Sequence, residues 1–202
     1  MNKPTYAFDS DGFYHNDAQF LIGGGSKYLV GVLNSPVCWW FLTKSCTDLQ
    51  NGYLQALKAN QLPIPIATAS AEQQAAIETV VDYLLWLHRA DAGTVSADAL
   101  MTGYWEQVVN ALVYELYFPD ELRAHLAPTA PTAPTARDPA HRPILARVQA
   151  ADLPAVTTWP GPRRTAELRA LFQQLYDPNH PLRGTLFSLA SLETVKLIEG
   201  RA

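Results

Sequence analysis

The sequence predicts an α+β fold that is mostly helical: a small N-terminal β-sheet with a bent helix, then a helical hairpin, then a C-terminal helical pair. Short aromatic runs flank an Asp-Gly turn near the N-terminus, apolar residues recur at helical spacing later, and a proline-rich segment precedes the last helices. These features divide the chain into residues 1–68, 69–126, 127–143 and 144–202. Its length of 202 residues allows one or two domains.

The predicted sheet lies within the first 22 residues. The aromatic runs Tyr6–Phe8 and Phe13–Tyr14 surround the turn Asp9–Gly12, in which glycine supplies the positive φ of a tight hairpin. Phe20–Ile22 is expected to form a further strand before Gly23–Gly25 lead into a helix. Three consecutive glycines match no nucleotide-binding loop, and Asp-x-Asp-Gly is an ordinary turn composition, so we favour a structural role over phosphate or metal binding here.

A bent helix is predicted next. Its first part covers about Ser26–Leu33, and Pro36 then interrupts it, because proline cannot continue a helix but fits the first turn of the next one. Ser35 is expected to cap that second part. Residues 53–57 and the Pro-Ile-Pro-Ile run within residues 62–66 are expected to be extended, since each proline removes a backbone donor.

Two helices of about 20 residues are predicted to form an antiparallel hairpin around Gly93. Ser70 followed by Gln73 is the signature of a capping box at the start of the first helix. The apolar stripes that predict the pair are Ile77, Val80, Leu84 and Leu87 in the first helix and Leu100, Tyr104, Val108, Leu112 and Leu116 in the second.

Leu126–Pro143 is predicted to be a mobile, extended linker, because its repeated Thr-Ala-Pro composition offers too little apolar surface to offset the entropy of ordering. A proline-rich docking site is the alternative. Beyond it, helices are predicted over residues 165–176 and from Pro181 toward Ile198, and they are expected to pack on the hairpin.

The charge of the chain is unevenly distributed. The formal net charge is -4, which argues against a strong, autonomous DNA binder with an overall basic surface. Residues 1–66 are neutral, residues 67–136 carry two arginines against nine acidic groups, and residues 137–202 carry nine basic against six acidic groups. The N-terminal part therefore meets the least repulsion from a phosphate backbone, and the basic tail is a second candidate.

The sequence contains no pattern typical of a catalytic or metal site. It has no phosphate-binding loop and no His-Glu-x-x-His, and the five histidines show no ligand spacing. Cys38 and Cys46 are expected to be structural thiols in a reducing cytoplasm. We therefore expect no metal and no cofactor, and neither a signal peptide nor a membrane span.

Polar side chains gather between the bent helix and the Pro-Ile run. Lysine contacts phosphates, and asparagine or glutamine reads adenine through paired hydrogen bonds in the major groove. An ordinary solvated loop is the alternative interpretation. The candidate DNA-binding residues are Lys44, Ser45, Asn51, Tyr53, Lys58, Asn60 and Gln61.

Several segments together resemble the C-terminal target-recognition region of adenine-specific restriction-modification methyltransferases, the TaqI-like specificity domain of type II enzymes. Lys27–Ser35 looks like the family's YLLGLLNS helix, Tyr53–Ile66 is similar to its GYLRLKKSDLEKLPIP passage, and Leu112–Leu122 looks like its closing LVYELYGL signature. Further matching segments are Tyr6–Tyr14, Gln73–Leu87 and His180–Ile198. Each motif alone is hydrophobic and weak, whereas their order and spacing together are specific.

The resemblance implies a role in choosing DNA sequence. In such enzymes a catalytic domain binds S-adenosylmethionine and carries an Asn-Pro-Pro-Tyr or Asn-Pro-Pro-Phe motif for a flipped adenine, while the C-terminal region grips the duplex. This sequence contains neither motif. We therefore expect a remnant or fragment that is not itself an enzyme, in which residues 1–68 are a partial target-recognition subdomain.

The resemblance also implies the partners. Double-stranded DNA and a methyltransferase catalytic domain or subunit are expected, and no membrane. The alternative is a helical module for protein-protein interaction or homo-oligomerisation that has no autonomous DNA binding.

Overall fold

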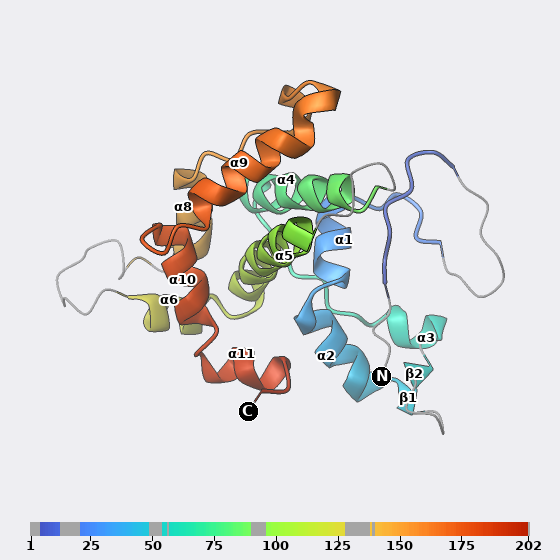
Figure 1. The fold of residues 1–202 in the computed structure, drawn as a ribbon. Coiled ribbons are helices and arrows are strands. Elements are labelled where there is room, and N and C mark those ends of the chain that lie inside the picture. The colour runs from blue at the N-terminus through green and yellow to red at the C-terminus, as the bar shows by residue number, and fades with distance from the viewer. Residues whose placement is uncertain are drawn as a thin grey trace.

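The computed structural model describes residues 5–12, 21–48, 54–55, 57–89, 96–127, 138 and 140–201. The elements in chain order are α1 Lys27–Leu33, α2 Pro36–Ser45, β1 Thr47–Asp48, β2 Leu54–Gln55, α3 Lys58–Gln61, α4 Ala71–Leu87, α5 Ser96–Tyr117, α6 Pro119–Leu126, α8 Pro143–Ala150, the 3-10 turns η1 Val156–Thr158 and η2 Gly161–Arg163, α9 Arg164–Leu175, α10 Pro181–Leu189 and α11 Glu193–Ile198. The α4–α5 hairpin is central, with α1 and α2 on one side and α8, α9 and α10 on the other (Figure 1).

The predicted N-terminal β-sheet is wrong, and the α+β class is wrong with it. In the described part of the first 26 residues, no residue belongs to a strand, and residues 13–20 lie outside that part. The turn itself does form: the Asp9 carboxylate accepts hydrogen bonds from the Asp11 and Gly12 amides at 2.8 and 2.9 Å, and Gly12 has a φ of 76°. Strand pairing in the described residues is limited to the two-residue antiparallel ladder of β1 and β2.

A side chain takes the place of the missing strand partner. The Asn34 amide accepts a hydrogen bond from the Tyr6 backbone N–H at 3.1 Å and donates one to the Tyr6 carbonyl oxygen at 2.8 Å. These are the two backbone groups that a neighbouring strand would have bonded. The aromatic segment is therefore fixed to the end of α1 and does not need a sheet.

The bent helix is confirmed. The Ser26 and Ser35 hydroxyls accept the amides of Leu29 and Cys38, which caps α1 and α2 respectively, and Pro36 occupies the first turn of α2. Ser35 is fully buried, and its hydroxyl also donates to the Val32 carbonyl oxygen at 2.6 Å. One side chain therefore ends the first helix and starts the second.

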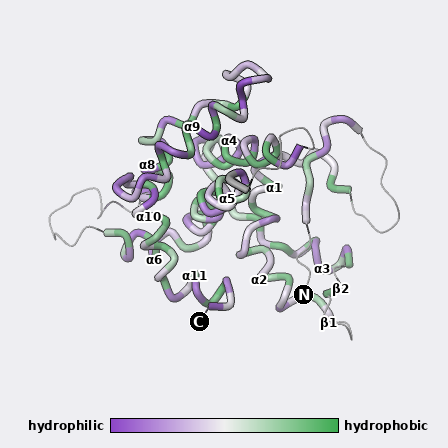
Figure 2. Tube along the Cα trace, viewed as in Figure 1, coloured by the Kyte–Doolittle hydropathy of each residue, from purple (hydrophilic) through white to green (hydrophobic). Residues whose placement is uncertain are grey.

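The helical hairpin is also confirmed. Ser70 and Gln73 form the predicted capping box, with each side chain bonded to the backbone amide of the other residue. Polar and apolar residues alternate along both helices, as the tube coloured by hydropathy shows (Figure 2). No described helix is both long enough and apolar enough to cross a membrane.

A close helix contact places α1 directly on the hairpin at Gly31. A Cβ added at this residue would lie 2.8 Å from Ile77 Cγ2, with Val81 and Val109 methyl groups at 3.2 and 3.3 Å. Only a residue without a side chain fits at that distance. A salt bridge of 2.7 Å between Lys27 on α1 and Asp82 on α4 also joins these two helices.

The C-terminal helices cover the other side of the hairpin. The helices predicted near residues 165–176 and beyond Pro181 are confirmed as α9, α10 and α11. The predictions omitted α3, α6 and α8, which begin or end at the edges of segments expected to be extended or linking. Residues 128–137 and 139 lie outside the described part, so the mobility of the linker and the domain boundaries stay predictions.

A buried carboxylate on α5 caps α8. Glu115 is 1% exposed, and its two oxygens accept the Ile144 and Leu145 amides at 2.7 and 3.0 Å. These amides belong to the first turn of α8, where no carbonyl oxygen of the helix itself is available. Burial raises the pKa of the Glu115 carboxyl above its ordinary value, although the two amides and Arg142 oppose the shift.

Replacing Gly31 with alanine is expected to lower the free energy of unfolding by about 1–3 kcal/mol, because the added methyl group forces α1 away from α4 and α5. Gly103 in α5 is the matched control, since a Cβ there meets no atom within 4 Å. Gly103→Ala is expected to be neutral or to stabilise by up to about 1 kcal/mol. Urea denaturation measures both, and equal effects would contradict the close crossing.

Replacing Glu115 with glutamine is expected to lower the free energy of unfolding by about 1–3 kcal/mol, because the amide has one oxygen acceptor for two buried N–H donors. The loss is also expected to depend on pH. A raised pKa means that the folded protein holds the proton more tightly than the unfolded chain, so this group adds stability as the pH falls toward its ordinary value of 4.5.

The difference in unfolding free energy between the natural protein and Glu115→Gln is therefore expected to be larger near pH 4.5 than at neutral pH. Urea denaturation at several pH values isolates this group, because all other carboxylates are common to both proteins. A difference that grows with rising pH would refute the assignment.

Candidate functional site

The described members of the predicted DNA-binding set come together at one corner of the molecule, where α2 ends and α3 begins. Lys44 lies in the last turn of α2, Lys58 is the first residue of α3, and both are exposed. Because α2 and α3 pack against each other, the two lysines belong to the same corner. Asn51 and Tyr53 lie outside the described residues, between β1 and β2.

Two of the predicted contact residues hold the corner together. The Asn60 Nδ2 donates to the Ser45 carbonyl oxygen at 2.8 Å, and the Asn60 Oδ1 accepts from the Leu57 amide at 3.1 Å. The Ser45 hydroxyl donates to the Phe41 carbonyl oxygen at 3.0 Å. Both ends of the Asn60 amide are therefore engaged, so reading a base with it requires these bonds to break.

The lysines at the corner differ in their pairing from Lys27. Among the described residues, neither Lys44 nor Lys58 has an ion-pair partner, whereas Lys27 is paired with Asp82. Gln61 is half-buried, and its backbone carbonyl oxygen accepts a hydrogen bond from the Ile64 amide at 3.2 Å. The corner therefore offers two exposed cations on a hydrogen-bonded backbone, which suits contact with an anionic polymer.

The corner has a small hydrophobic cluster of its own. A small cluster of buried side chains lies beneath α2 and α3, separate from the main core, and half-buried aromatic side chains pack against it. The buried members are Leu33, Cys38, Leu42 and Ile64. Beside the lysines, Leu57 and Leu62 are exposed. The corner therefore combines positive charge with accessible apolar surface.

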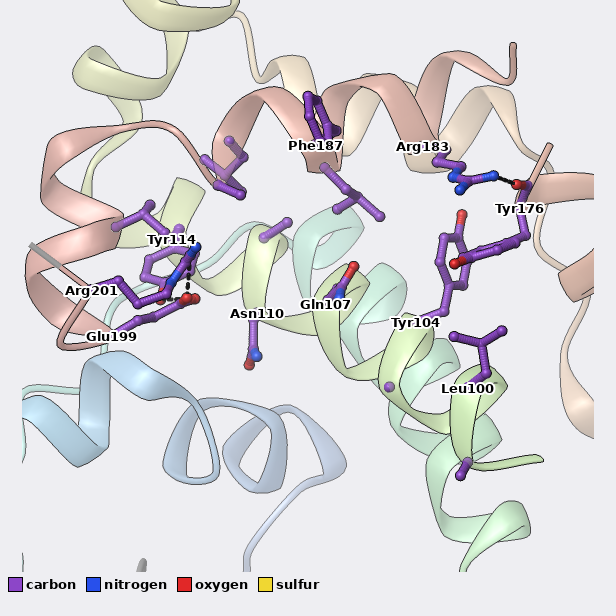
Figure 3. A pocket seen from close by; sticks show the side chains of 17 residues that line it. Leu100, Tyr104, Gln107, Asn110, Tyr114, Tyr176, Arg183, Phe187, Glu199 and Arg201 are labelled. Carbon is purple, nitrogen blue, oxygen red and sulfur yellow. Dashed lines mark hydrogen bonds and ion pairs between the residues drawn. The ribbon is translucent and has the colours of Figure 1, made fainter. Parts of the chain in front are cut away.

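A second feature is a groove of about 490 Å³ between α5 and the C-terminal helices α10 and α11 (Figure 3). At one end, the Arg183 guanidinium lies 3.9 Å from the centre of the Tyr176 ring and donates to the Tyr176 carbonyl oxygen. The neighbouring Tyr104 hydroxyl donates to the Leu175 carbonyl oxygen at 3.4 Å. Burial raises the pKa of Tyr104, so this hydroxyl stays a neutral donor at physiological pH.

The other end of the groove contains a charge pair. The Tyr114 hydroxyl donates to Glu199 Oε1 at 2.9 Å, and Arg201 pairs with the other oxygen of that carboxylate. Burial and the adjacent carboxylate raise the pKa of Tyr114. Gln107 and Asn110 lie between the two ends (Figure 3). The charged groups of the groove thus all have partners, and the Tyr104 and Tyr114 hydroxyls join α5 to the C-terminal segments.

Sequence reasoning missed the polar residues of this groove. Tyr104 was expected only as part of an apolar stripe, while Arg183 and Glu199 come from helices about 70 to 90 residues further along the chain. The excess of basic residues after position 137 was the one signal in the sequence that pointed to this half of the molecule.

In the part of the chain that the structure covers, few side chains are placed to bind a metal ion together. No group of three or more His, Cys, Asp or Glu side chains in that part is arranged to hold a metal ion. Cys38 is buried and Cys46 is half-buried. The Asp9 carboxylate, which had been considered as a metal ligand, accepts backbone hydrogen bonds within its own turn.

Comparison with known protein families, with curated proteins and with solved structures found no match to this chain.

Proposed function

We propose that this chain is a DNA sequence-recognition module of a restriction-modification system, and that it contacts the phosphate backbone through Lys44 and Lys58. The observation that carries the proposal is the presence of two exposed lysines without ion-pair partners, among the described residues, on one corner of the fold. The same corner lies within the segments whose order resembles the TaqI-like specificity domain.

The local construction of the corner supports this role. The Asn60 amide joins α3 to the end of α2, so the lysine backbones are preorganised and only the flexible side chains need to be ordered on binding. β1 and β2 pair at the same corner and flank residues 49–53, which include the candidate contacts Asn51 and Tyr53. Base reading is assigned to this polar segment and to Gln61, and phosphate contact to the lysines.

The proposed module supplies recognition and leaves the chemistry to a partner. Transfer of a methyl group requires an S-adenosylmethionine-binding domain or subunit, which acts in the cytoplasm together with this chain. The net charge of -4 limits the affinity of the isolated module for DNA, so binding is expected to be local and dependent on salt concentration.

Replacing both Lys44 and Lys58 with glutamine is expected to weaken binding to a mixed-sequence DNA duplex roughly tenfold or more at low salt. The slope of log affinity against log salt is expected to fall by about 2, since each lost phosphate contact removes about 0.9. Fluorescence anisotropy over a series of salt concentrations measures both quantities.

The matched control is Lys196→Gln on α11, where the ammonium group is already paired with Glu193 at 2.6 Å. This change is expected to leave the slope unaltered. The proposal fails if the natural protein does not bind duplex DNA at low salt, or if the control lowers the slope as much as the double replacement.

Self-association is a second candidate function, and one observation favours it. Phe187 is 84% exposed and Leu100 is 54% exposed, although both line the groove between α5 and α10. Exposed aromatic side chains at the rim of a groove are typical anchors of protein interfaces. A second copy of the chain, offering the same Phe187 to the same groove, would cover both residues.

Phe187→Ser is expected to convert a dimer into a monomer if this second function is correct, and light scattering after size-exclusion chromatography measures the mass. Leu21→Ser is the control, because Leu21 is 71% exposed and does not line the groove. A natural protein that is monomeric at high concentration would exclude this function.

A further inference from the structure

A second cavity, of about 580 Å³, lies between the end of α6, the first part of α8 and one side of α10. Its lining combines basic side chains with hydroxyl groups, contributed by these three helices and the segment that precedes α8. The polar residues that line it are Arg123, His125, His141, Arg147, Thr185 and Ser188. Among the described residues that line it there is no aspartate or glutamate, in contrast to the groove on α5, where Glu199 offsets Arg201.

The charge in this cavity is only partly neutralised. The Arg123 side chain is 15% exposed, and its Nη2 donates to Asp120 at 2.7 Å, whose carboxylate is 87% exposed to solvent. The Arg123 Nε is buried and has no acceptor among the described residues. Arg147 is exposed, and the described residues contain no ion-pair partner for it. A buried donor without an acceptor costs free energy that a bound anion in the cavity would reduce.

The two histidines line the cavity from α6 and from the segment that precedes α8. His125 Nε2 lies 2.9 Å from the Ser188 carbonyl oxygen, and because a carbonyl only accepts, this contact assigns the proton to Nε2 and fixes the ring between α6 and α10. His141 is half-buried immediately before α8, where its amide donates to the Asp138 carbonyl oxygen at 2.9 Å. The His125 ring is therefore held in one orientation in the wall of the cavity.

Folding brings basic residues from two separate parts of the chain to this cavity. Arg123 is one of only two arginines in residues 67–136, which carry nine acidic groups, whereas Arg147 belongs to the basic tail. The packing of α6 on α8 and α10 brings these two arginines to one cavity. A positive cavity on an acidic protein attracts anions locally, despite the net charge of the whole molecule.

We propose that this cavity binds a phosphate group, carried either by a nucleic-acid backbone or by a free nucleotide or phosphate ion. Arginine guanidinium groups bind phosphate oxygens through charge-assisted hydrogen bonds, and Arg123 and Arg147 supply such groups here. The Thr185 hydroxyl and His125 Nε2 already donate to the Pro181 and Ser188 carbonyl oxygens, so they shape the wall of the cavity. The site is formed by residues other than those of the corner at α2 and α3, so it does not depend on the proposed recognition of DNA sequence.

The first test is titration of the whole chain with inorganic phosphate at constant ionic strength, followed by NMR of the His125 and His141 rings and of backbone amides near α8. Saturable shifts at these residues are expected. Arg147→Gln is expected to weaken phosphate binding about tenfold, as for the loss of one charge-assisted donor. The matched control is Arg163→Gln, since Arg163 is exposed, pairs with Glu167 at 2.7 Å and does not line the cavity. The proposal is overturned if phosphate gives no saturable shift, or if both replacements have the same effect.

Two further titrations identify the source of the phosphate. A short DNA duplex that binds more weakly to Arg147→Gln, and that inorganic phosphate displaces from the cavity, identifies a nucleic-acid backbone. A nucleoside monophosphate that displaces inorganic phosphate, with duplex affinity unchanged by Arg147→Gln, identifies a small ligand. The double replacement of Lys44 and Lys58 separates the two proposals, because it is expected to reduce duplex binding and to leave the phosphate titration intact.

Discussion

The position of every N-terminal element depends on the close approach of α1 to the α4–α5 hairpin. Methyl groups of Ile77, Val81 and Val109 occupy the space in which a side chain at Gly31 would lie, so α1 rests directly on the helix surface. Ser35 then ends α1 and starts α2 without an intervening loop. The orientation of α2, and with it the corner that carries Lys44, is therefore set by apolar packing at Gly31, more than ten residues before Lys44 in the chain.

Local signals in the sequence predicted most of the helices. The serine caps, the proline at the start of α2 and the spacing of apolar residues in α4 and α5 act over three or four residues, which is the range that a sequence pattern can describe. The sheet failed because a strand needs a distant partner. The Tyr6 backbone instead forms its hydrogen bonds with the Asn34 side chain, 28 residues away. A periodic pattern in the sequence does not predict such a contact.

The candidate site was predictable only in part. The exposure of Lys44 and Lys58 follows from their polar surroundings, but the use of the Asn60 amide as a brace between α2 and α3 depends on a carbonyl oxygen 15 residues earlier. The groove on α5 and the basic cavity between α6, α8 and α10 are assembled from residues more than 50 positions apart, such as His125 and Ser188. The spacing of residues in the sequence does not predict such long-range contacts.

Glu115 caps α8 through main-chain amides, so it places little restriction on the side chains at the start of that helix. Both hydrogen bonds that it accepts come from main-chain amides, so they require a peptide N–H at positions 144 and 145 and are indifferent to the side chains there. Any amino acid except proline satisfies that requirement. The natural proline stands one position earlier, at Pro143, where the carboxylate needs no donor. The side chains at positions 144 and 145 can therefore change subject only to packing, while the acceptor at position 115 is held constant by two partners at once.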